Sequence, residues 1–233
     1  MSTHNAECVA AQPYYDHEGI TIYHGDCREI LGTSVTAADV ILTDFPYGVG
    51  VDYGPAYEDT PEALCELIDT ALPLMRQTAP VVALTCGIGN WWRFPPTTWV
   101  LCWYQSNAPT ASGRWGFNQW QPVLAYGGDP YLKRLKGRRS DVVAVGASGK
   151  DLIAGRNSDH PCPKPLGAWK QILLRVSPDT SDVILDPFMG SGTTLACAKA
   201  AGRRAIGIEI EERFCEIAAK RLSQGVLDFE GVA

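Results

Sequence analysis

The chain has 233 residues, of which 45% are hydrophobic and 20% charged, and its formal net charge is −6. This composition excludes collagen-like, coiled-coil and wholly disordered chains and is that of an ordinary globular domain. The sequence contains no apolar run of the roughly 18–20 residues that cross a bilayer, no signal-peptide pattern and no C-x-x-C pair among its eight cysteines. We therefore expect one cytoplasmic domain, with no membrane partner and no metal site.

The first predicted strands lead into a short polar motif. Residues 1–18 are polar and irregular, whereas Ile20–Tyr23 and Val40–Thr43 are the short apolar runs of buried strands. The second run continues into Asp44-Phe45-Pro46-Tyr47. An acid, a rigid turn and an aromatic ring suit a flat base with an exocyclic amine, because the carboxylate accepts from N–H groups and the ring stacks. The alternative is a turn that only ends the strand.

A helix and two further strands follow. The helix begins at Thr60, where a hydroxyl cap precedes a proline, and its apolar stripe extends to Met75. Pro73 lies within the stripe and is expected to kink or end the helix. Strands are predicted at Val81–Leu84 and Trp99–Trp103.

Between about residues 105 and 160 the alternation of strand and helix is lost. Gly, Pro, Asn, Ser and basic residues dominate, interrupted by the apolar runs Pro122–Tyr126 and Val142–Val145. We interpret this segment as a small inserted lobe within a single 1–233 domain.

The same part of the chain is basic. Residues 103–173 contain ten Lys and Arg against four Asp, so they carry +6 and the rest of the chain carries −12. This asymmetry is expected where one face of a protein meets a polyanion, although a charge run also fits a solvated surface. The basic run at its centre consists of Lys133, Arg134, Lys136, Arg138 and Arg139. Four tryptophans, Trp91, Trp92, Trp115 and Trp120, are candidates to contact bases, although burial is the commoner state of so large a ring.

Regular alternation then returns and predicts a parallel sheet covered by helices on both sides. The predicted elements are a helix at Leu166–Val176, a strand at Val183–Leu185, a helix at Thr193–Ala201, a strand at Ala205–Ile208 and a last helix with Phe214, Ile217, Ala218 and Leu222 on one face.

Two of these strands end in features of a nucleoside site. Asp186–Thr194 is a turn in which Gly190 and Gly192 let the backbone approach a ligand closely. Glu209 ends the next strand, where a carboxylate can accept hydrogen bonds from both hydroxyls of a ribose. The alternatives are a tight strand-to-helix turn and an acidic helix start, since Leu195 stands where a dinucleotide fingerprint has its third glycine.

Together these motifs resemble a known family. Asp44–Tyr47 is similar to a D-P-P-Y motif, with Phe45 in place of the first proline; His160–Leu166 resembles H-P-x-x-K-P; and Asp186–Thr194 resembles D-P-F-x-G-S-G-T-T. Tyr23–Cys27 and Gly207–Glu209 resemble the flanking G-D-C and acidic strand-end motifs. In this order they resemble the S-adenosyl-L-methionine (SAM)-dependent amino-DNA methyltransferases of the permuted beta class, which modify adenine N6 or cytosine N4.

The resemblance implies a Rossmann-like α/β fold, SAM as cofactor and double-stranded DNA as partner, in a bacterial cell or from a phage, with no metal. Homodimers are common in that family. It assigns the 105–160 lobe to target recognition and DNA contact. The implied catalytic residues are Asp44, Phe45, Pro46 and Tyr47. The implied cofactor residues are Asp26, Asp44, Lys164, Pro165, Asp186, Phe188, Gly190, Ser191, Gly192, Thr193, Thr194 and Glu209, with Asp26 on the adenine amine, Glu209 on the ribose, and Lys164 and Pro165 over the methionine end.

The implied reaction is methyl transfer to a base flipped out of the duplex. Asp44 and the Phe45 carbonyl would accept hydrogen bonds from the amine, and Tyr47 would stack on the base. An Asp at the first motif position favours adenine N6. The alternatives are cytosine N4, methylation of RNA or another amine, and a SAM-binding partner without activity.

Overall fold

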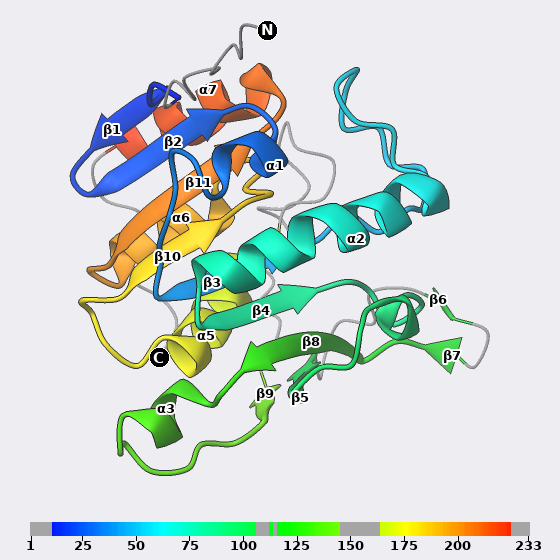
Figure 1. Cartoon of the computed structure of the whole chain (residues 1–233). Coiled ribbons are helices and arrows are strands. Elements are labelled where there is room, and N and C mark those ends of the chain that lie inside the picture. Colours follow the sequence, from blue (N-terminus) through cyan, green and yellow to red (C-terminus); the bar gives the residue numbers. More distant parts are fainter. Residues whose placement is uncertain (1–10, 106–111, 114–115, 145–163, 225–233) are drawn as a thin grey trace, which may run out of the picture.

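The computed structural model describes residues 11–105, 112–113, 116–144 and 164–224. Its nine-stranded sheet has the order β1-β2-β11-β10-β3-β4-β8-β5-β9 (Figure 1). Five neighbouring strands run parallel, namely β2 (Ile20–His24), β11 (Arg204–Glu209), β10 (Val183–Asp186), β3 (Val40–Asp44) and β4 (Val81–Thr85). Their apolar side chains are buried on both faces, as in parallel sheets generally.

Four further strands complete the sheet at both sides, through three antiparallel pairings and the parallel pairing of β5 with β9. β8 (Trp120–Gly127) runs antiparallel between β4 and β5 (Trp99–Tyr104), and β9 (Val142–Ala144) pairs with β5. β8 and β9 lie within the segment predicted as an inserted lobe, so these parts of it are integral to the sheet. At the other side, β1 (Tyr15–His17) pairs with β2 in a stretch predicted to be irregular. A separate short ribbon joins β6 (Ser112–Gly113) and β7 (Gly116–Phe117).

Helices cover both faces of the sheet, which confirms the predicted α/β class (Figure 1). α1 (Cys27–Ile30) and α2 (Pro61–Thr78) pack on one face, where Ile41 and Leu185 point. Val40, Leu42 and Ile184 point to the opposite face and its helices. These helices are α5 (Leu166–Val176), α6 (Thr193–Ala200) and α7 (Glu212–Ser223). None of the helices in the described segments has the length and hydropathy to cross a membrane.

Helix α2 does not end at Pro73, which corrects the expectation of a helix end there; a kink at Pro73 stays a prediction. The helix starts as predicted, with the Thr60 hydroxyl accepting a hydrogen bond from the Ala63 N–H, but it continues through Pro73 to Thr78. Pro73 is exposed, so the carbonyl left without a partner by its missing N–H lies on the solvent side. Leu72 and Met75 are buried on either side of it and hold the helix to the sheet.

The parallel strands bring the sequence motifs to one edge of the sheet. β2, β3, β10 and β11 all end there, and the loops that follow them carry the polar motifs. Such carboxyl edges are where open α/β sheets bind ligands.

Candidate active site

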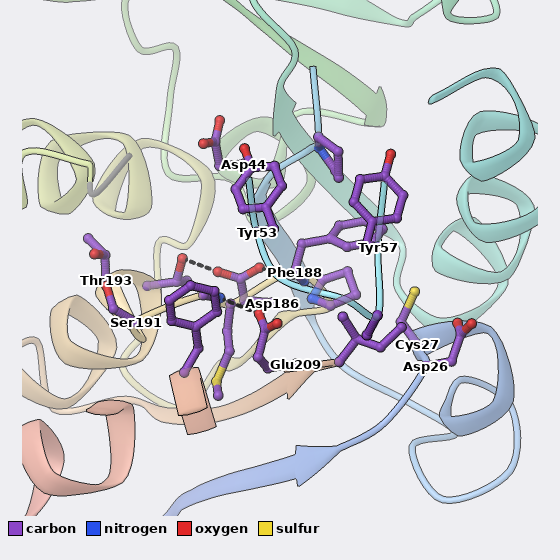
Figure 2. A pocket seen from close by; sticks show the side chains of 18 of the residues that line it. Asp26, Cys27, Asp44, Tyr53, Tyr57, Asp186, Phe188, Ser191, Thr193 and Glu209 are labelled. Atoms are coloured by element: carbon purple, nitrogen blue, oxygen red, sulfur yellow. Dashed lines mark hydrogen bonds between the residues drawn. The ribbon is translucent and has the colours of Figure 1, made fainter. Parts of the chain in front are cut away.

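A single pocket at this edge collects residues from all the motifs (Figure 2). Of the predicted site residues, those lining it are Asp26, Asp44, Pro46, Lys164, Asp186, Phe188, Gly190, Ser191, Thr193, Thr194 and Glu209. Pro165, Gly192, Phe45 and Tyr47 are placed beside these residues without lining the pocket. His160–Pro163, the first part of one motif, lies outside the described residues. The described residues contain no group of three or more potential ligands arranged to hold a metal ion.

The Asp186 side chain holds the glycine-containing turn at 186–194 (the glycine loop) in place through hydrogen bonds. Its Oδ1 accepts hydrogen bonds from the Thr43 hydroxyl at 2.6 Å and the Phe188 N–H at 3.1 Å, and its Oδ2 accepts one from Thr194. The Trp169 indole donates in turn to the Thr194 hydroxyl at 2.8 Å. Burial raises the pKa of Asp186 to about 6, although the two hydroxyl donors favour its charged form. These contacts tie β10 to β3 and to the start of α6.

The two glycines of the loop have distinct tasks. Gly192 has φ +78°, and a Cβ there would lie 2.9 Å from the Cβ of Ala218, so this position lets α7 pack closely against the loop. The Gly190 N–H donates to Glu209 Oε2 at 2.8 Å. The loop and the end of β11 are therefore joined directly at the pocket.

Glu209 is a second buried carboxylate of the pocket, beside Asp186. Its two oxygens accept from the Gly190 N–H and, at 3.0 Å, from the Glu211 N–H. Each oxygen uses one lone pair in this way and keeps capacity to accept from a ligand. Burial raises the pKa of Glu209 to about 7 against the effect of these backbone donors, and the nearby charge of Asp186 raises it further.

The loop between β3 and α2 covers one side of the pocket. The buried Asp59 carboxylate accepts from the N–H groups of Gly48, Val49 and Val51 at 2.7–3.1 Å and so fixes the start of the loop. Further along, the Ala56 N–H donates to Glu211 Oε1 at 2.7 Å. This attachment joins the loop to the segment that begins α7.

The same loop adds aromatic rings that the motifs did not identify. Tyr53 and Tyr57 line the pocket together with Phe188, and Figure 2 shows the three rings around it. The buried Tyr57 hydroxyl has no hydrogen-bond partner within the described residues. Burial, followed by the charge of Asp59, raises the pKa of Tyr57 to about 12, so its hydroxyl stays protonated and able to donate.

Asp44 lies at the centre of a second polar cluster. Lys164 Nζ is 2.6 Å from its Oδ2, and the Tyr47 hydroxyl donates to its Oδ1 at 2.9 Å. The Thr85 hydroxyl also donates to Oδ1 from the end of the neighbouring strand. Burial works against the charge of Lys164, but the carboxylate of Asp44 outweighs it and holds the pKa of Lys164 above its ordinary value.

The side chain of Phe45 points away from this cluster. It is 1% exposed, and its ring packs edge-on against Phe94 at 5.3 Å and Phe188 at 4.8 Å between centroids. Only the backbone of Phe45 therefore faces the site. The ring of Tyr47 packs against the segment that follows the neighbouring strand β4, where a Cβ on Gly87 would lie 3.2 Å from the ring.

Asp26 is already engaged by its own helix. It caps α1, accepts from the Arg28 N–H at 2.8 Å and pairs with the Arg28 guanidinium at 2.6 Å. Burial alone would raise the pKa of Asp26, but the hydrogen bonds from Arg28 lower it below its ordinary value. Asp26 lines the pocket as an ionised group whose two oxygens are both held by donors of Arg28.

The basic run lies near the amino ends of the parallel strands, whereas the pocket lies at their carboxyl ends. It begins in the short helix α3 (Pro130–Lys133), which follows the end of β8. There Gly127 pairs with Val81, the first residue of β4, whereas Thr85 beside Asp44 is the last residue of that strand. In Figure 1, α3 accordingly lies at the left-hand end of β4 and the strand points away from it.

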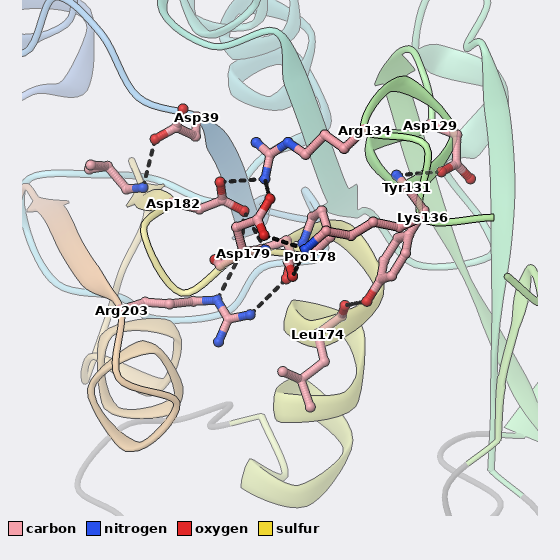
Figure 3. A network of polar contacts seen from close by, with 12 residues as sticks. Asp39, Asp129, Tyr131, Arg134, Lys136, Leu174, Pro178, Asp179, Asp182 and Arg203 are labelled. Carbon is pink, nitrogen blue, oxygen red and sulfur yellow. Dashed lines mark hydrogen bonds and ion pairs between the residues drawn. The ribbon is translucent and has the colours of Figure 1, made fainter. Parts of the chain in front are cut away.

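Part of the run is also neutralised by acids (Figure 3). Arg134 pairs with Asp179 at 2.7 Å and with Asp182 at 2.6 Å, and Lys136 also pairs with Asp179. Arg134 and Lys136 thus join α3 to the loop before β10, and DNA contact by these two residues stays a prediction. DNA contact by the exposed Lys133, Arg138 and Arg139 stays a prediction as well.

This ion-pair network leads to a prediction about stability. Replacing Arg134 with alanine leaves the carboxylate of Asp182, which is 3% exposed, without its cationic partner. We expect the free energy of unfolding to fall by about 1–3 kcal/mol, measured by urea denaturation. Arg138→Ala, at an exposed neighbouring position, is the control and should change it by less than about 0.5 kcal/mol. Equal effects of the two substitutions would contradict a stabilising role for the network.

Several residues of the site were missed in the sequence. Thr43 and Thr85 bond to Asp186 and Asp44 through their hydroxyls. Their signal is a single polar residue near the carboxyl end of an otherwise apolar strand. Asp59 and Glu211 give no such signal, because their roles depend on how the loop after β3 folds.

Comparisons with known proteins agree with this geometry. A family described as DNA methylase matches residues 90–220, which is more than half of the chain. The DNA adenine methyltransferase YhdJ of Escherichia coli (strain K12) is 26% identical over 89% of this chain and 84% of its own length. The type II methyltransferase M.HinfI of Haemophilus influenzae is 38% identical, but over 40% of this chain and 26% of its own length.

Solved structures share the fold. The M1.HpyAVI–SAM complex matches with a TM-score of 0.60 and 24% identity, covering 87% of this chain and 99% of that one. The PvuII DNA methyltransferase, described as cytosine-N4-specific, matches with a TM-score of 0.66 and 14% identity, covering 93% and 91%.

Proposed function

The chain belongs to the DNA methylase family, and on this premise we propose that it transfers a methyl group from SAM to the N6 amine of adenine in double-stranded DNA. The observation that carries the proposal is that Asp44 and Glu209, which end different strands, line one pocket. Asp44, a hydrogen-bond acceptor for an amine, and Glu209, a hydrogen-bond acceptor for ribose hydroxyls, thus lie in the same pocket.

The residues of the pocket fit a SAM molecule. Glu209 keeps lone pairs for the ribose hydroxyls, and Phe188, Tyr53 and Tyr57 offer aromatic faces for the adenine ring. The unpaired Tyr57 hydroxyl is a donor that a nucleoside can satisfy. The hydroxyls of Ser191 and Thr193 add polar groups on the glycine loop. When bound, SAM would supply the methyl group: its carbon–sulfur bond would break as the carbon–nitrogen bond forms, and the positively charged sulfur would become a neutral thioether. The proton lost by the amine would pass to the Asp44 carboxylate, which accepts its hydrogen bond, and from there to solvent.

The contribution of the protein to the chemistry is positioning and electrostatics. An exocyclic amine is a poor nucleophile because its lone pair is delocalised into the ring. Asp44 and the Phe45 carbonyl accept hydrogen bonds from the amine and shift electron density onto its nitrogen as the new bond forms. Thr85 and Tyr47 hold the Asp44 carboxylate in one orientation before the base arrives.

Lys164 also contacts the catalytic motif, in addition to the role over the methionine end that the sequence motif implies. Its ammonium pairs with Asp44 and lies 5.1 Å from the centroid of the Tyr47 ring. It therefore occupies the acceptor and the ring face that a base requires. The entering amine replaces the ammonium on Asp44 Oδ2, after which Lys164 is available to a carboxylate such as that of the methionine moiety. Pro165 places Lys164 by starting α5 directly after it.

Adenine is favoured over cytosine on two grounds. The first motif position is Asp44, and the relative from E. coli that aligns along most of the chain is an adenine methyltransferase. Cytosine N4 is the second candidate, since the PvuII enzyme of that specificity has the same fold.

The test is incubation of the chain with methyl-labelled SAM and duplex DNA, followed by nucleoside mass spectrometry. The proposal predicts N6-methyladenine. N4-methylcytosine would replace adenine with the second candidate, and no incorporation over a range of duplex sequences would contradict DNA methylation. A parallel reaction with RNA tests the remaining alternative.

Cofactor binding is expected to depend on pH through Glu209. Its pKa, raised to about 7, means that the carboxylate gains a proton as the pH falls from 8 to 6 and loses acceptor capacity for the ribose. We expect the Kd of SAM to rise about tenfold over this range, measured by calorimetry, and to vary much less in Glu209→Gln. A Kd that stays constant in the wild-type chain would contradict the role of Glu209.

Stability of the free chain moves in the opposite direction through the same group. Because the folded-state pKa of Glu209 lies above the ordinary value of 4.5, the folded state binds the proton more tightly than the unfolded chain. Its contribution to stability therefore grows as the pH falls from about 7 towards 4.5 and is lost as the pH rises through 7. This difference separates weakened cofactor binding from acid unfolding.

A further inference from the structure

Two tryptophans next to the catalytic motif have rings that are exposed to solvent rather than packed in the core. They belong to a short 3₁₀ helix, η1 (Trp91–Arg93), which follows the carboxyl end of β4. Trp91 is 39% exposed and Trp92 is 68% exposed, and Arg93 beside them is exposed as well. Rings of this size are usually buried, and adjacent exposed ones mark interaction sites.

This turn is firmly attached to the catalytic motif. The Asn90 side-chain N–H₂ donates to the Tyr47 carbonyl at 2.6 Å, and the Arg93 side chain donates back to Asn90 Oδ1 at 3.2 Å. On the other side of the turn, Phe94 is buried against the ring of Phe45. The two tryptophans are thus presented by an ordered base that is bonded to the residues around Asp44.

The aromatic surface continues onto β8. The Trp91 ring lies 6.1 Å from the ring of Trp120 at 73°, in an edge-to-face contact. The next residue, Gln121, places its Oε1 3.4 Å from the Tyr47 hydroxyl. Trp120 thus extends the aromatic surface of Trp91, and its neighbour Gln121 contacts Tyr47 from the other face of β8.

Arg93 differs from the arginine of the α3 network in having no acidic partner among the residues that the structure describes. Within the described residues it contacts the Asn90 amide and the Cys65 sulfur, and no carboxylate lies within ion-pair distance. An exposed, unpaired guanidinium beside aromatic rings suits a phosphate backbone next to bases.

We propose that Trp91, Trp92 and Arg93 form the surface that receives the DNA duplex beside the flipped base. The inference rests on the proposed function. A base that enters the pocket leaves neighbours whose faces are exposed, and the protein at the rim of the pocket is what they meet. The tryptophan rings contact these flanking bases, and Arg93 pairs with a nearby phosphate. The proposed partner is thus a kinked DNA duplex, which the aromatic rings and one cation of this surface contact.

The test compares Trp92→Ala with Trp99→Ala. Trp99 serves as the control because it is 60% exposed and is the first residue of β5, whereas Trp120, beside Trp91, pairs with Tyr104 at the other end of that strand. The Trp99 indole N–H donates to Asp141 Oδ2 at 3.2 Å. We expect Trp92→Ala to raise the Kd for a substrate duplex about tenfold or more, measured by fluorescence anisotropy with S-adenosylhomocysteine present. Trp99→Ala should change it less than twofold. Trp92→Phe should recover much of the affinity, and the Kd of SAM should be the same in all three variants.

The possible results distinguish DNA contact by this surface, contact with a second copy of the chain, and failure of the proposed function itself. Equal DNA affinity of the Trp92 and Trp99 variants would overturn the inference while wild-type methylation of DNA still upholds the proposed function. A change in oligomeric state on replacing Trp92, with DNA affinity unchanged, would instead assign the surface to a second copy of the chain. Failure of the wild-type chain to methylate DNA is the separate result that removes the proposed function itself.

Discussion

Replacing Asp44 with asparagine is expected to reduce kcat for methyl transfer on the order of a thousandfold. The asparagine keeps the shape of the side chain and an oxygen that can accept from Thr85 and Tyr47. It loses the charge that polarises the amine, and loss of one such preorganised electrostatic contact costs on the order of 10²–10³ in rate. The measurement is single-turnover methylation of duplex DNA with labelled SAM.

The control for this substitution lies on the outer surface of α2. Asp69→Asn removes an exposed carboxylate and should leave kcat unchanged. The Kd of SAM should stay within a few-fold in both variants, because the proposed ribose acceptor, Glu209, is untouched. If Asp44→Asn weakened SAM binding as much as it lowered the rate, Asp44 would be a structural residue of the pocket.

Replacing Glu209 with alanine is expected to raise the Kd of SAM on the order of a hundredfold or more. The substitution removes a charged acceptor for ribose hydroxyls, and hydrogen bonds to charged groups contribute about 1.5–3 kcal/mol each. It also releases the Gly190 N–H and so loosens the glycine loop. Isothermal titration calorimetry measures the affinity.

Two comparisons isolate the cause of that loss. Glu212→Gln changes an exposed acid three residues along the chain and should leave SAM affinity unchanged. Glu209→Gln keeps one acceptor oxygen and should lie between the wild type and Glu209→Ala. A normal affinity in Glu209→Ala would show that the ribose binds elsewhere.

The main elements and the pocket follow from short-range patterns. Apolar runs such as Val183–Leu185 need no long-range information to be identified as strands, and α5 has the predicted bounds. Because parallel strands end at a common edge, the motifs after β3 and β10 necessarily come together. The position of the candidate pocket therefore follows from the sequence pattern alone.

Features that depend on distant contacts could not be predicted. The acids that neutralise Arg134 lie some 45 positions away, so the run at 133–139 has the same pattern whether it is free or paired. Pro73 looks like a helix end until the buried residues around it are known to face the sheet. Asp44 and Lys164 each belong to a recognisable motif, but no local pattern predicts that they pair across 120 positions.

The proposed reaction requires that the cofactor at Glu209 and the target base at Asp44 meet in one pocket. A crystal structure of the chain with S-adenosylhomocysteine and a duplex containing a flipped adenine is the most direct test of this requirement. The ribose hydroxyls should bond to Glu209, and the adenine amine should bond to Asp44 and face the sulfur, with room for a methyl group at the reactive separation of about 3–3.5 Å. A cofactor bound away from Glu209, or a sulfur turned away from Asp44, would contradict the proposed reaction.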